Sequence, residues 1–194
     1  MAQRVLIVQA HPDNSQRHLC HALADAYAEG ASSGGHELRV LDVAEIDFPL
    51  LRSKAQWEGP VPPSLLQAQA DILWAGHLVF VFPLWLGGMP ALLKGFLEQV
   101  ARPGFAIGKP GAAGLPHKLL AGRSARLIVT MGMPALVYRY YFRAHSVKSL
   151  ERNVLGFVGI APVHETLIGM VERTQDKERE RWLGRLRELG RNAA

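Results

Sequence analysis

The sequence predicts an α/β fold with three layers, in which a five-stranded parallel sheet carries helices on both faces. Two observations carry this prediction. Five apolar or β-branched runs alternate along the chain with segments of helical character, which is the pattern of parallel strands joined by right-handed crossover helices. The chain has 194 residues, of which 48% are hydrophobic and 20% charged. That is enough for one well-buried core, so we expect a single domain over residues 1–194.

The first two strands lie close to the amino terminus. The run Arg4–Ala10 (RVLIVQA) predicts a central strand, which Pro12 ends because proline cannot extend it. From Gln16 to about Gly30, apolar residues recur at helical spacing and predict an amphipathic helix. After the Ser-Ser-Gly-Gly break, His36–Val43 predicts a second strand.

Residues 44–63 carry four prolines and predict an irregular connection. Ser64 is then a suitable N-cap for a helix over Leu65–Ala75. The stretch from Val79 to Gly95 (VFVFPLWLGGMPALLKG) predicts a buried third strand, a tight loop, and a helix that starts at Pro90 and ends near Ala101.

The second half of the chain begins with the glycine- and proline-rich segment 102–122. So long a loop within a compact domain is usually functional or covers something. The remaining segments predict a fourth strand (Ala125–Thr130), a helix from about Phe142 within the segment Tyr138–Leu155, a fifth strand (Pro162–Met170), and a charged last helix (Thr174–Gly190).

Charge and cysteine content exclude several functional classes. The net charge of +5 is dispersed, without the basic stripe and interleaved aromatics of a nucleic-acid site. A single cysteine, Cys20, permits no intramolecular disulfide, and residues 1–10 show no signal peptide, so we expect a cytoplasmic protein. The uncharged stretch from Ile72 to Leu93 has the length of a membrane span, but Pro83 and Pro90 would break such a helix.

The loop after the first strand is the first candidate site. His11, Asn14, Ser15, Gln16 and Arg17 place polar donors and a cation at a helix amino terminus, where an anion such as phosphate is bound favourably. Asn14 or Ser15 could instead act only as the N-cap of the helix. The GxGxxG fingerprint of dinucleotide-binding Rossmann folds is absent from this segment.

Two further loops follow strands of the same sheet and should meet the first loop at its carboxyl edge. The backbone of Pro83–Gly88 and of Thr130–Met133 could hold a flat polar ring system by main-chain hydrogen bonds. Tyr138 and His145 could together donate to an oxyanion that forms when a carbonyl is reduced. Taken alone, each of these two side chains is more often a packing or surface residue.

Other chemistries lack support. His18, Cys20 and His21 offer no second ligand pair at metal-binding spacing, so we expect no metal site, and Cys20 is most simply a core residue. Neither GxSxG nor GxxxxGK[ST] occurs, which argues against hydrolase and P-loop functions.

Three motifs give the chain a resemblance to a known family. AHPDNS after the first strand, FPLWLGGMPALLKGFLEQV after the third, and VTMGMP with a following tyrosine resemble the NAD(P)H:quinone oxidoreductases of the flavodoxin-like fold, the relatives of DT-diaphorase. The resemblance implies a bound flavin, either FMN or FAD, and a homodimer with the active site at its interface. It places these residues around the flavin: His11, Ser15, Gln16 and Arg17 at the phosphate, and Pro83, Leu84, Trp85, Leu86, Thr130, Met131, Gly132 and Met133 along the ring system.

The resemblance also implies that Tyr138 and His145 assist hydride transfer, the match of His145 requiring a shift of one residue. Cys20 and His18 depart from the family, since they stand where relatives often carry an asparagine. We therefore predict a flavoenzyme that takes hydride from NAD(P)H and passes it to a quinone or similar small-molecule acceptor by a ping-pong mechanism, with Trp85 and Phe105 as stacking walls.

Two other functions stay open at this point. A flavodoxin-like regulatory subunit of a membrane transporter would share these motifs, and its basic last helix would offer a docking face. A one-electron carrier is the third possibility, although such carriers are usually acidic. The connection 44–63 is short for covering an adenine, which leaves FMN open against FAD.

Overall fold

The computed structural model describes residues 2–110 and 116–194. It confirms the predicted five-stranded parallel sheet, whose strand order β2-β1-β3-β6-β7 is that of the flavodoxin-like fold. Strand β2 lies on one side of β1, and β3 lies on the other. The connections that leave β1 and β3 therefore run in opposite directions along the sheet, and the point between these two strands is the switch point. The strands are β1 (Arg4–Gln9), β2 (Glu37–Asp42), β3 (His77–Pro83), β6 (Ser124–Thr130) and β7 (Val163–Ile168).

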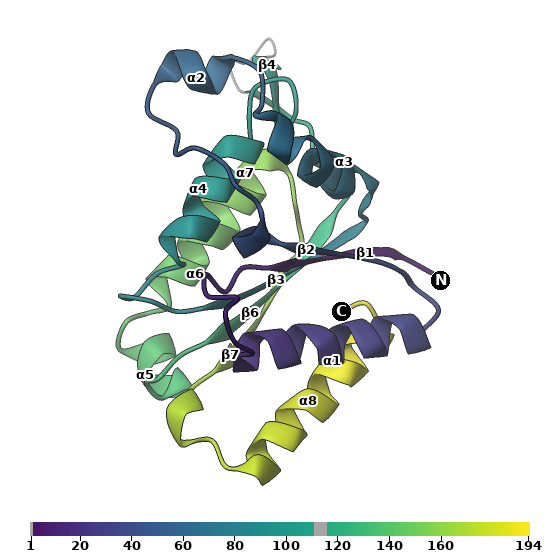
Figure 1. Cartoon of the computed structure of the whole chain (residues 1–194), viewed down its shortest axis with the longest axis vertical. Coiled ribbons are helices and arrows are strands. Elements are labelled where there is room, and N and C mark those ends of the chain that lie inside the picture. The colour runs from purple at the N-terminus through teal and green to yellow at the C-terminus, as the bar shows by residue number, and fades with distance from the viewer. Residues whose placement is uncertain (1, 111–115) are drawn as a thin grey trace.

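Helices cover both faces of the sheet (Figure 1). On one face lie α1 (Leu19–Ser33) and α8 (Asp176–Arg191); on the other lie α3 (Leu66–Trp74), α4 (Ala91–Val100) and the helical segment that ends with α7 (Gly156–Val158). All seven residues of β3 are buried, as a central strand between two helical layers requires.

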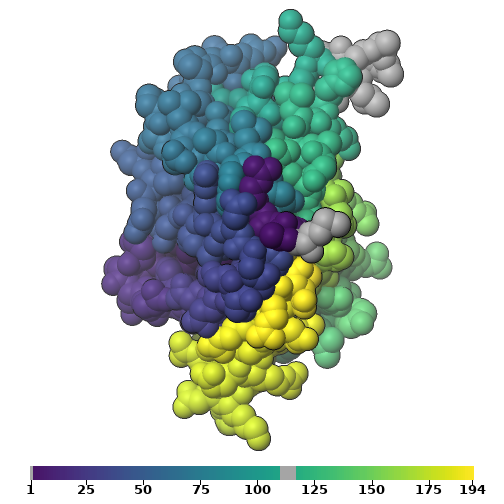
Figure 2. Space-filling model, turned by 90° about the vertical axis from the view of Figure 1, so that its right-hand side faces the viewer, coloured from purple at the N-terminus to yellow at the C-terminus, as the bar shows by residue number. Residues whose placement is uncertain are grey.

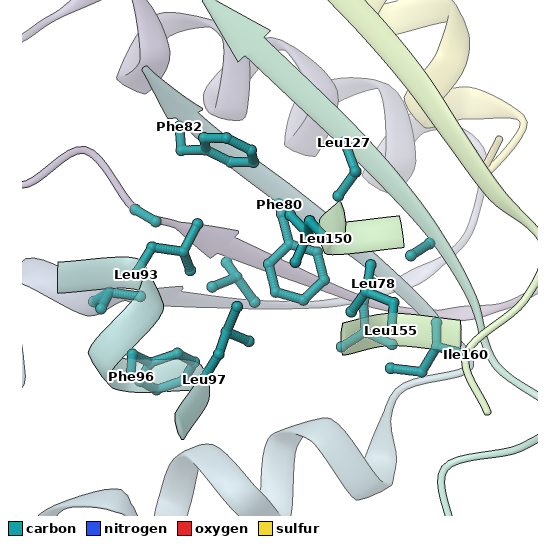
Figure 3. Packing of buried hydrophobic residues seen from close by; sticks show 14 of the residues in the cluster. Leu78, Phe80, Phe82, Leu93, Phe96, Leu97, Leu127, Leu150, Leu155 and Ile160 are labelled. Carbon is teal, nitrogen blue, oxygen red and sulfur yellow. The ribbon is translucent and has the colours of Figure 1, made fainter. Parts of the chain in front are cut away.

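The alternation of side chains along the strands produces two hydrophobic clusters. Leu78, Phe80 and Phe82 of β3 face α4 and the segment before α7, where they pack with Leu93 and Phe96 (Figure 3). Val79 and Val81 of the same strand face the opposite layer and pack with α1 and α8. This two-sided burial fixes the register of the sheet, because a shift by one residue would exchange the two sets.

The helices α1 and α8 cross at two glycines. A Cβ atom built on Gly190 would lie 2.1 Å from the carbonyl oxygen of Tyr27, and one built on Gly30 would lie 2.0 Å from that of Arg187. The two backbones therefore touch directly. Figure 2 shows the end of α8, in yellow, lying against the blue-violet amino-terminal part of the molecule. This contact anchors the end of the chain beside α1.

Several element boundaries differ from the prediction. Helix α1 begins at Leu19 instead of Gln16, because Asp13 accepts hydrogen bonds from Ser15 and His18 and holds the preceding residues in a loop. The irregular connection contains a short helix, α2 (Lys54–Glu58), and two 3₁₀ turns (Val43–Glu45 and Pro63–Leu65). Ser64 is not an N-cap, since it lies inside the second of these turns.

The segment after β6 also folds differently from the prediction. It becomes helical immediately after Pro134 and not near Phe142, with α5 (Ala135–Tyr140), α6 (His145–Ser149) and a π-helical stretch (Leu150–Leu155) leading into α7. A third 3₁₀ turn (Val171–Arg173) precedes α8. The segment 102–122 forms a small antiparallel pair, β4 (Ile107–Pro110) and β5 (Pro116–Lys118), and its residues 111–115 lie outside the described part. Among the described helices, none is both long and apolar enough to cross a membrane.

Candidate functional site

Four parallel strands end at the same edge of the sheet, and the loops that follow them enclose a cleft of about 290 Å³. This lies near the lower end of the volumes typical of small-molecule sites, as expected of a cleft with one open side. The residues that line it come from the segments after β1, β3, β6 and β7: His11, His18, Leu19, Cys20, Pro83, Leu84, Trp85, Thr130, Met131, Gly132, Val171 and Glu172.

The loop after β1 is held by the carboxylate of Asp13. It accepts hydrogen bonds from the Ser15 amide (2.9 Å) and hydroxyl (2.5 Å), and its second oxygen lies 2.8 Å from Nε2 of His18. The bond from the Ser15 hydroxyl, followed by the contact with His18, holds the pKa of Asp13 well below its usual range. Asp13 is therefore ionised at neutral pH and orients the His18 ring at the start of α1.

Three imidazole rings lie close together between this loop and the start of α1. His11 stacks on His18, with ring centroids 3.9 Å apart and planes 17° from parallel. The His21 ring lies 5.5 Å from that of His11, and its Nδ1 accepts a hydrogen bond from the His18 amide at 3.0 Å. Burial, followed by the nearby His18, lowers the pKa of His11 below its ordinary value of 6.5. We name His11, His18 and His21 the imidazole cluster.

The loop after β3 makes a tight turn. The amides and carbonyls of Trp85 and Gly88 form two reciprocal hydrogen bonds of 2.9 Å. The two residues between them, Leu86 (φ 48°) and Gly87 (φ 78°), have left-handed backbones, as a type I′ turn requires. A left-handed backbone is strained for leucine. In this turn the Leu86 side chain is exposed to solvent. The Trp85 ring turns the other way and meets His11 edge-on.

The loops after β6 and β7 are tied together by their backbones. The Met131 amide donates to the carbonyl of Ile168 (2.8 Å), and the Val171 amide donates to that of Met131 (3.2 Å). Glu172 thereby lies next to Gly132, where an added Cβ would approach its carboxylate at 3.4 Å. On the cleft's floor the Cys20 thiol meets the Thr130 hydroxyl at 3.2 Å, and burial raises the pKa of this thiol to about 11.

Half of the predicted site residues line this cleft: His11, Pro83, Leu84, Trp85, Thr130, Met131 and Gly132. The other predicted residues of the loops do not. Ser15 bonds to Asp13, Gln16 is exposed, and Arg17 pairs with Asp25 on the surface. Leu86 occupies the tip of its turn, and the Met133 carbonyl accepts from the Met170 amide.

The predicted catalytic pair also lies outside the lining. Tyr138 is 2% exposed, packs in the core, and its hydroxyl accepts a hydrogen bond from the Val147 amide at 3.3 Å. His145 is exposed at the start of α6. Phe105, predicted as a stacking wall, packs against the core cluster around Leu78 and Phe80 instead.

Five residues that line the cleft were not predicted from the sequence as part of the site. His18, Leu19 and Cys20 belong to the first turn of α1, which was expected one turn earlier in the chain. Val171 and Glu172 follow β7. The same rule that selected the loops after the other strands, namely that carboxyl ends of parallel strands share an edge, would have found these two.

The donor set of the cleft suits a phosphorylated flavin. The amino terminus of the 15-residue α1 points into the cleft region lined by His11 and His18, and a helix amino terminus favours a phosphoryl group. Leu84, Trp85 and Met131 border the remainder of the cleft. A metal ion has no such support: no three His, Cys, Asp or Glu side chains among residues 2–110 and 116–194 have metal-binding geometry.

Comparison with known proteins agrees with this fit. The model of the family described as "Flavodoxin-like fold" matches residues 3–189. An uncharacterized NAD(P)H oxidoreductase of Haemophilus influenzae is 28% identical over 90% of this chain and 88% of its own length. An FMN-dependent NADH:quinone oxidoreductase of Nitratidesulfovibrio vulgaris is 26% identical, covering 91% of this chain and 93% of that protein.

A solved structure extends the likeness to three dimensions. The NAD(P)H:quinone oxidoreductase from Methanothermobacter marburgensis superposes with a TM-score of 0.80 at 27% identity, covering 99% of this chain and 97% of that one. Sequence and fold similarity therefore extend over nearly the whole chain.

Proposed function

This chain belongs to the flavodoxin-like fold family, and we propose that it is a flavin-dependent NAD(P)H:quinone oxidoreductase. The observation that carries the proposal is the cleft at the switch point of the sheet. It joins phosphate-binding donors at the start of α1 to an apolar wall formed by the loops after β3 and β6. We propose FMN as the cofactor, since one of the relatives is FMN-dependent. A cytoplasmic location stays a prediction from the sequence.

The flavin, when bound, supplies the redox chemistry: it accepts hydride from NAD(P)H and delivers it to the acceptor. The chain's own residues bind and orient it. The start of helix α1, with His11 and His18 beside it, would hold the phosphoryl group, and the loops after β6 and β7, which are linked by backbone hydrogen bonds, border the cleft. Trp85 borders one side, so donor and acceptor would use the same open side in turn, which is a ping-pong sequence.

The test uses the purified protein. We expect it to be yellow as isolated or after addition of FMN, to bleach with NADH or NADPH in the absence of air, and to recover its colour when a benzoquinone is added. A protein that binds neither FMN nor FAD would refute the proposal. Bleaching with sluggish quinone turnover, together with tight binding to a transporter, would favour the regulatory subunit.

Tyr138 remains a proposed catalytic residue, and its substitution by phenylalanine separates the two half-reactions. Its hydroxyl accepts a hydrogen bond from the Val147 amide, and the side chain is buried outside the lining of the cleft, so a catalytic role requires the acceptor to reach this hydroxyl. We expect Tyr138→Phe to slow quinone reduction roughly 3- to 30-fold, less than the about 10²-fold typical of a dry oxyanion site, with flavin reduction by NAD(P)H unchanged. Stopped-flow traces of each half-reaction decide the matter. Equal slowing of both would mean that Tyr138 positions the loop after β6, and no change would leave it a packing residue.

We also propose a homodimer. Large apolar side chains are exposed on two segments: Trp85 and Leu86 on the turn after β3, which borders the cleft, and Leu136, Tyr140 and Tyr141 on and after α5. A monomer rarely leaves so many apolar side chains uncovered in neighbouring segments. In the described part of the segment 102–122, Ala106 and Leu120 are buried and add nothing to this exposed surface.

Light scattering should therefore give twice the 21.3 kDa chain mass. The double substitution Leu86→Ser with Tyr141→Ser should shift the protein toward monomer, whereas Leu50→Ser, which removes an exposed leucine from the connection before α2, should not. A monomeric mass that is independent of concentration, with full activity, would contradict the dimer.

A further inference from the structure

We propose that the carboxylate of Glu172 makes the bound flavin a stronger reductant, because it opposes the negative charge that the flavin ring gains when it takes up hydride. The inference rests on the proposed function and goes beyond it, since it assigns the tuning of the reduction potential to a residue outside the predicted site. Its consequence is that removal of this one charge raises the reduction potential of the bound flavin.

The backbone just before Glu172 is fixed to the loop after β6. The Met170 amide donates to the carbonyl of Met133 at 3.1 Å, and the Val171 amide donates to that of Met131 at 3.2 Å. Glu172 itself lies in the 3₁₀ turn that precedes α8. Its side chain is exposed, but these bonds hold the start of that side chain beside the loop after β6.

The carboxylate of Glu172 reaches the part of the cleft that the loop after β6 forms. Glu172 and Gly132 both line the cleft. The atom nearest to the Cβ position of Gly132 is Oε1 of Glu172, at 3.4 Å. A flavin ring that rests along Met131 and Gly132, where the motif VTMGMP predicts it, therefore has this carboxylate beside it.

No ion pair offsets the negative charge of Glu172 within the described part of the chain. Arg173, the next residue, lines a separate cleft between α5 and α8. The imidazoles of His11 and His18 line the cleft from the segment after β1, and β3 and β6 separate that strand from β7 in the sheet. Among the residues that line the cleft, Glu172 is the one with a carboxylate.

The charge of the flavin ring changes when it is reduced. Hydride transfer from NAD(P)H brings two electrons and one proton to a neutral ring and releases NAD(P)⁺, so the reduced ring carries one negative charge until it takes up a second proton from solvent. Repulsion between this charge and the Glu172 carboxylate raises the free energy of the reduced form alone. The phosphoryl charge of FMN is the same in both forms and cancels. The reduced flavin is thereby destabilised relative to the oxidised one, which favours passing hydride to the acceptor.

The exposure of Glu172 limits the size of this effect. Solvent raises the effective dielectric constant and screens the charge, so the repulsion is weaker than between two buried groups. We expect Glu172→Gln to strengthen the binding of reduced FMN relative to oxidised FMN by roughly 5- to 10-fold. Because a tenfold change equals 29.6 mV for a two-electron couple, the reduction potential should rise by about 20–30 mV.

The experiment measures the reduction potential of FMN bound to the purified protein, by equilibration with a reference dye in the absence of air. A mildly alkaline pH is used, because uptake of the second proton by the reduced ring is then disfavoured. Quenching of flavin fluorescence gives the affinity for oxidised FMN and shows that the cleft is filled in every variant. The readout is an equilibrium property and does not depend on turnover.

Two further variants and a salt series assign the shift to the charge. Glu172→Asp keeps the carboxylate and should change the relative affinity for reduced FMN by less than about 2-fold. The matched control is Glu188→Gln, which removes the same charge from an exposed position near the end of α8 and should behave like the unmodified protein. In about 1 M salt, where the Debye length is about 3 Å, the difference between Glu172→Gln and the unmodified protein should fall to less than half.

An unchanged potential in Glu172→Gln, an equal shift in Glu172→Asp, or a shift that persists undiminished in high salt would overturn this inference and leave the proposed function standing. A protein that binds neither FMN nor FAD would overturn both.

Discussion

Replacing Gly132 with tryptophan is expected to weaken flavin binding by roughly 100-fold while the protein remains folded. Gly132 lines the cleft and is exposed, and its φ is not in the left-handed region, so an L-residue fits its backbone. A Cβ atom there would meet only the end of the Glu172 side chain, at 3.4 Å, which can move aside. The indole would then occupy space in the cleft. Overpacking of this kind costs about 1–3 kcal/mol, and the upper end corresponds to about 100-fold in a dissociation constant.

The control is Gly132→Ala, which adds only the tolerated Cβ and should change flavin affinity by less than about 3-fold. Fluorescence quenching measures the affinities, and circular dichroism with thermal unfolding reports whether the fold is intact. Normal flavin binding by a correctly folded Gly132→Trp protein would place the flavin elsewhere on the molecule and would refute the assignment of the cleft.

The five-stranded parallel sheet could be predicted because its strands are continuous apolar runs in the sequence. The run from Leu78 to Phe82 is buried on both faces, and its short length and its content of valine and phenylalanine favour a strand over a buried helix. The helix boundaries were harder, because side-chain hydrogen bonds decide them. The first turn of α1 was displaced by the bonds of Asp13.

Helix α2 did carry a signal. Ser53 accepts the Gln56 amide at 3.2 Å, and the spacing Ser-x-x-Gln is a known helix start. The helix was missed because the prolines around it suggested an irregular connection.

The candidate site was predictable as a set of loops but not as a set of side chains. Parallel strands end at one edge, which selected Pro83, Trp85 and Thr130 correctly as cleft residues. Whether a polar residue within such a loop faces the ligand depends on its local partners. Arg17 forms an ion pair with Asp25 on the surface, away from the cleft. His18 lines the cleft, and its Nε2 contacts the carboxylate of Asp13. Neither pairing can be read from residue spacing alone.

The sequence placed His11 at the phosphate of the flavin, whereas the position of His18 in the cleft could not be predicted. His18 was considered only as a metal ligand and as a departure from the expected asparagine. Its stacking on His11, seven residues earlier, arises because the loop folds back over the start of α1. The replacement of the family's asparagine by His18 could be interpreted only when the structure showed its contacts with His11 and Asp13.

Gly190→Ala is expected to lower the free energy of unfolding by about 1–2 kcal/mol, because α1 and α8 touch at this residue. The added Cβ would lie 2.1 Å from the carbonyl oxygen of Tyr27 and 2.9 Å from the Ala31 amide nitrogen, and backbone atoms cannot move aside as a side chain can. Overpacking against such a contact costs about 1–3 kcal/mol and occasionally more. The gain of about 1 kcal/mol from replacing glycine within a helix offsets only part of it.

Gly184→Ala is the matched control on the same helix. Gly184 is exposed and an added Cβ would meet nothing within 4 Å, so this substitution should raise stability by up to about 1 kcal/mol through helix propensity alone. Urea unfolding followed by circular dichroism measures both proteins. Because α1 begins at the cleft, separation of the two helices should also weaken flavin binding in Gly190→Ala. Equal stability of the two variants would mean that α8 does not rest on α1 through this glycine.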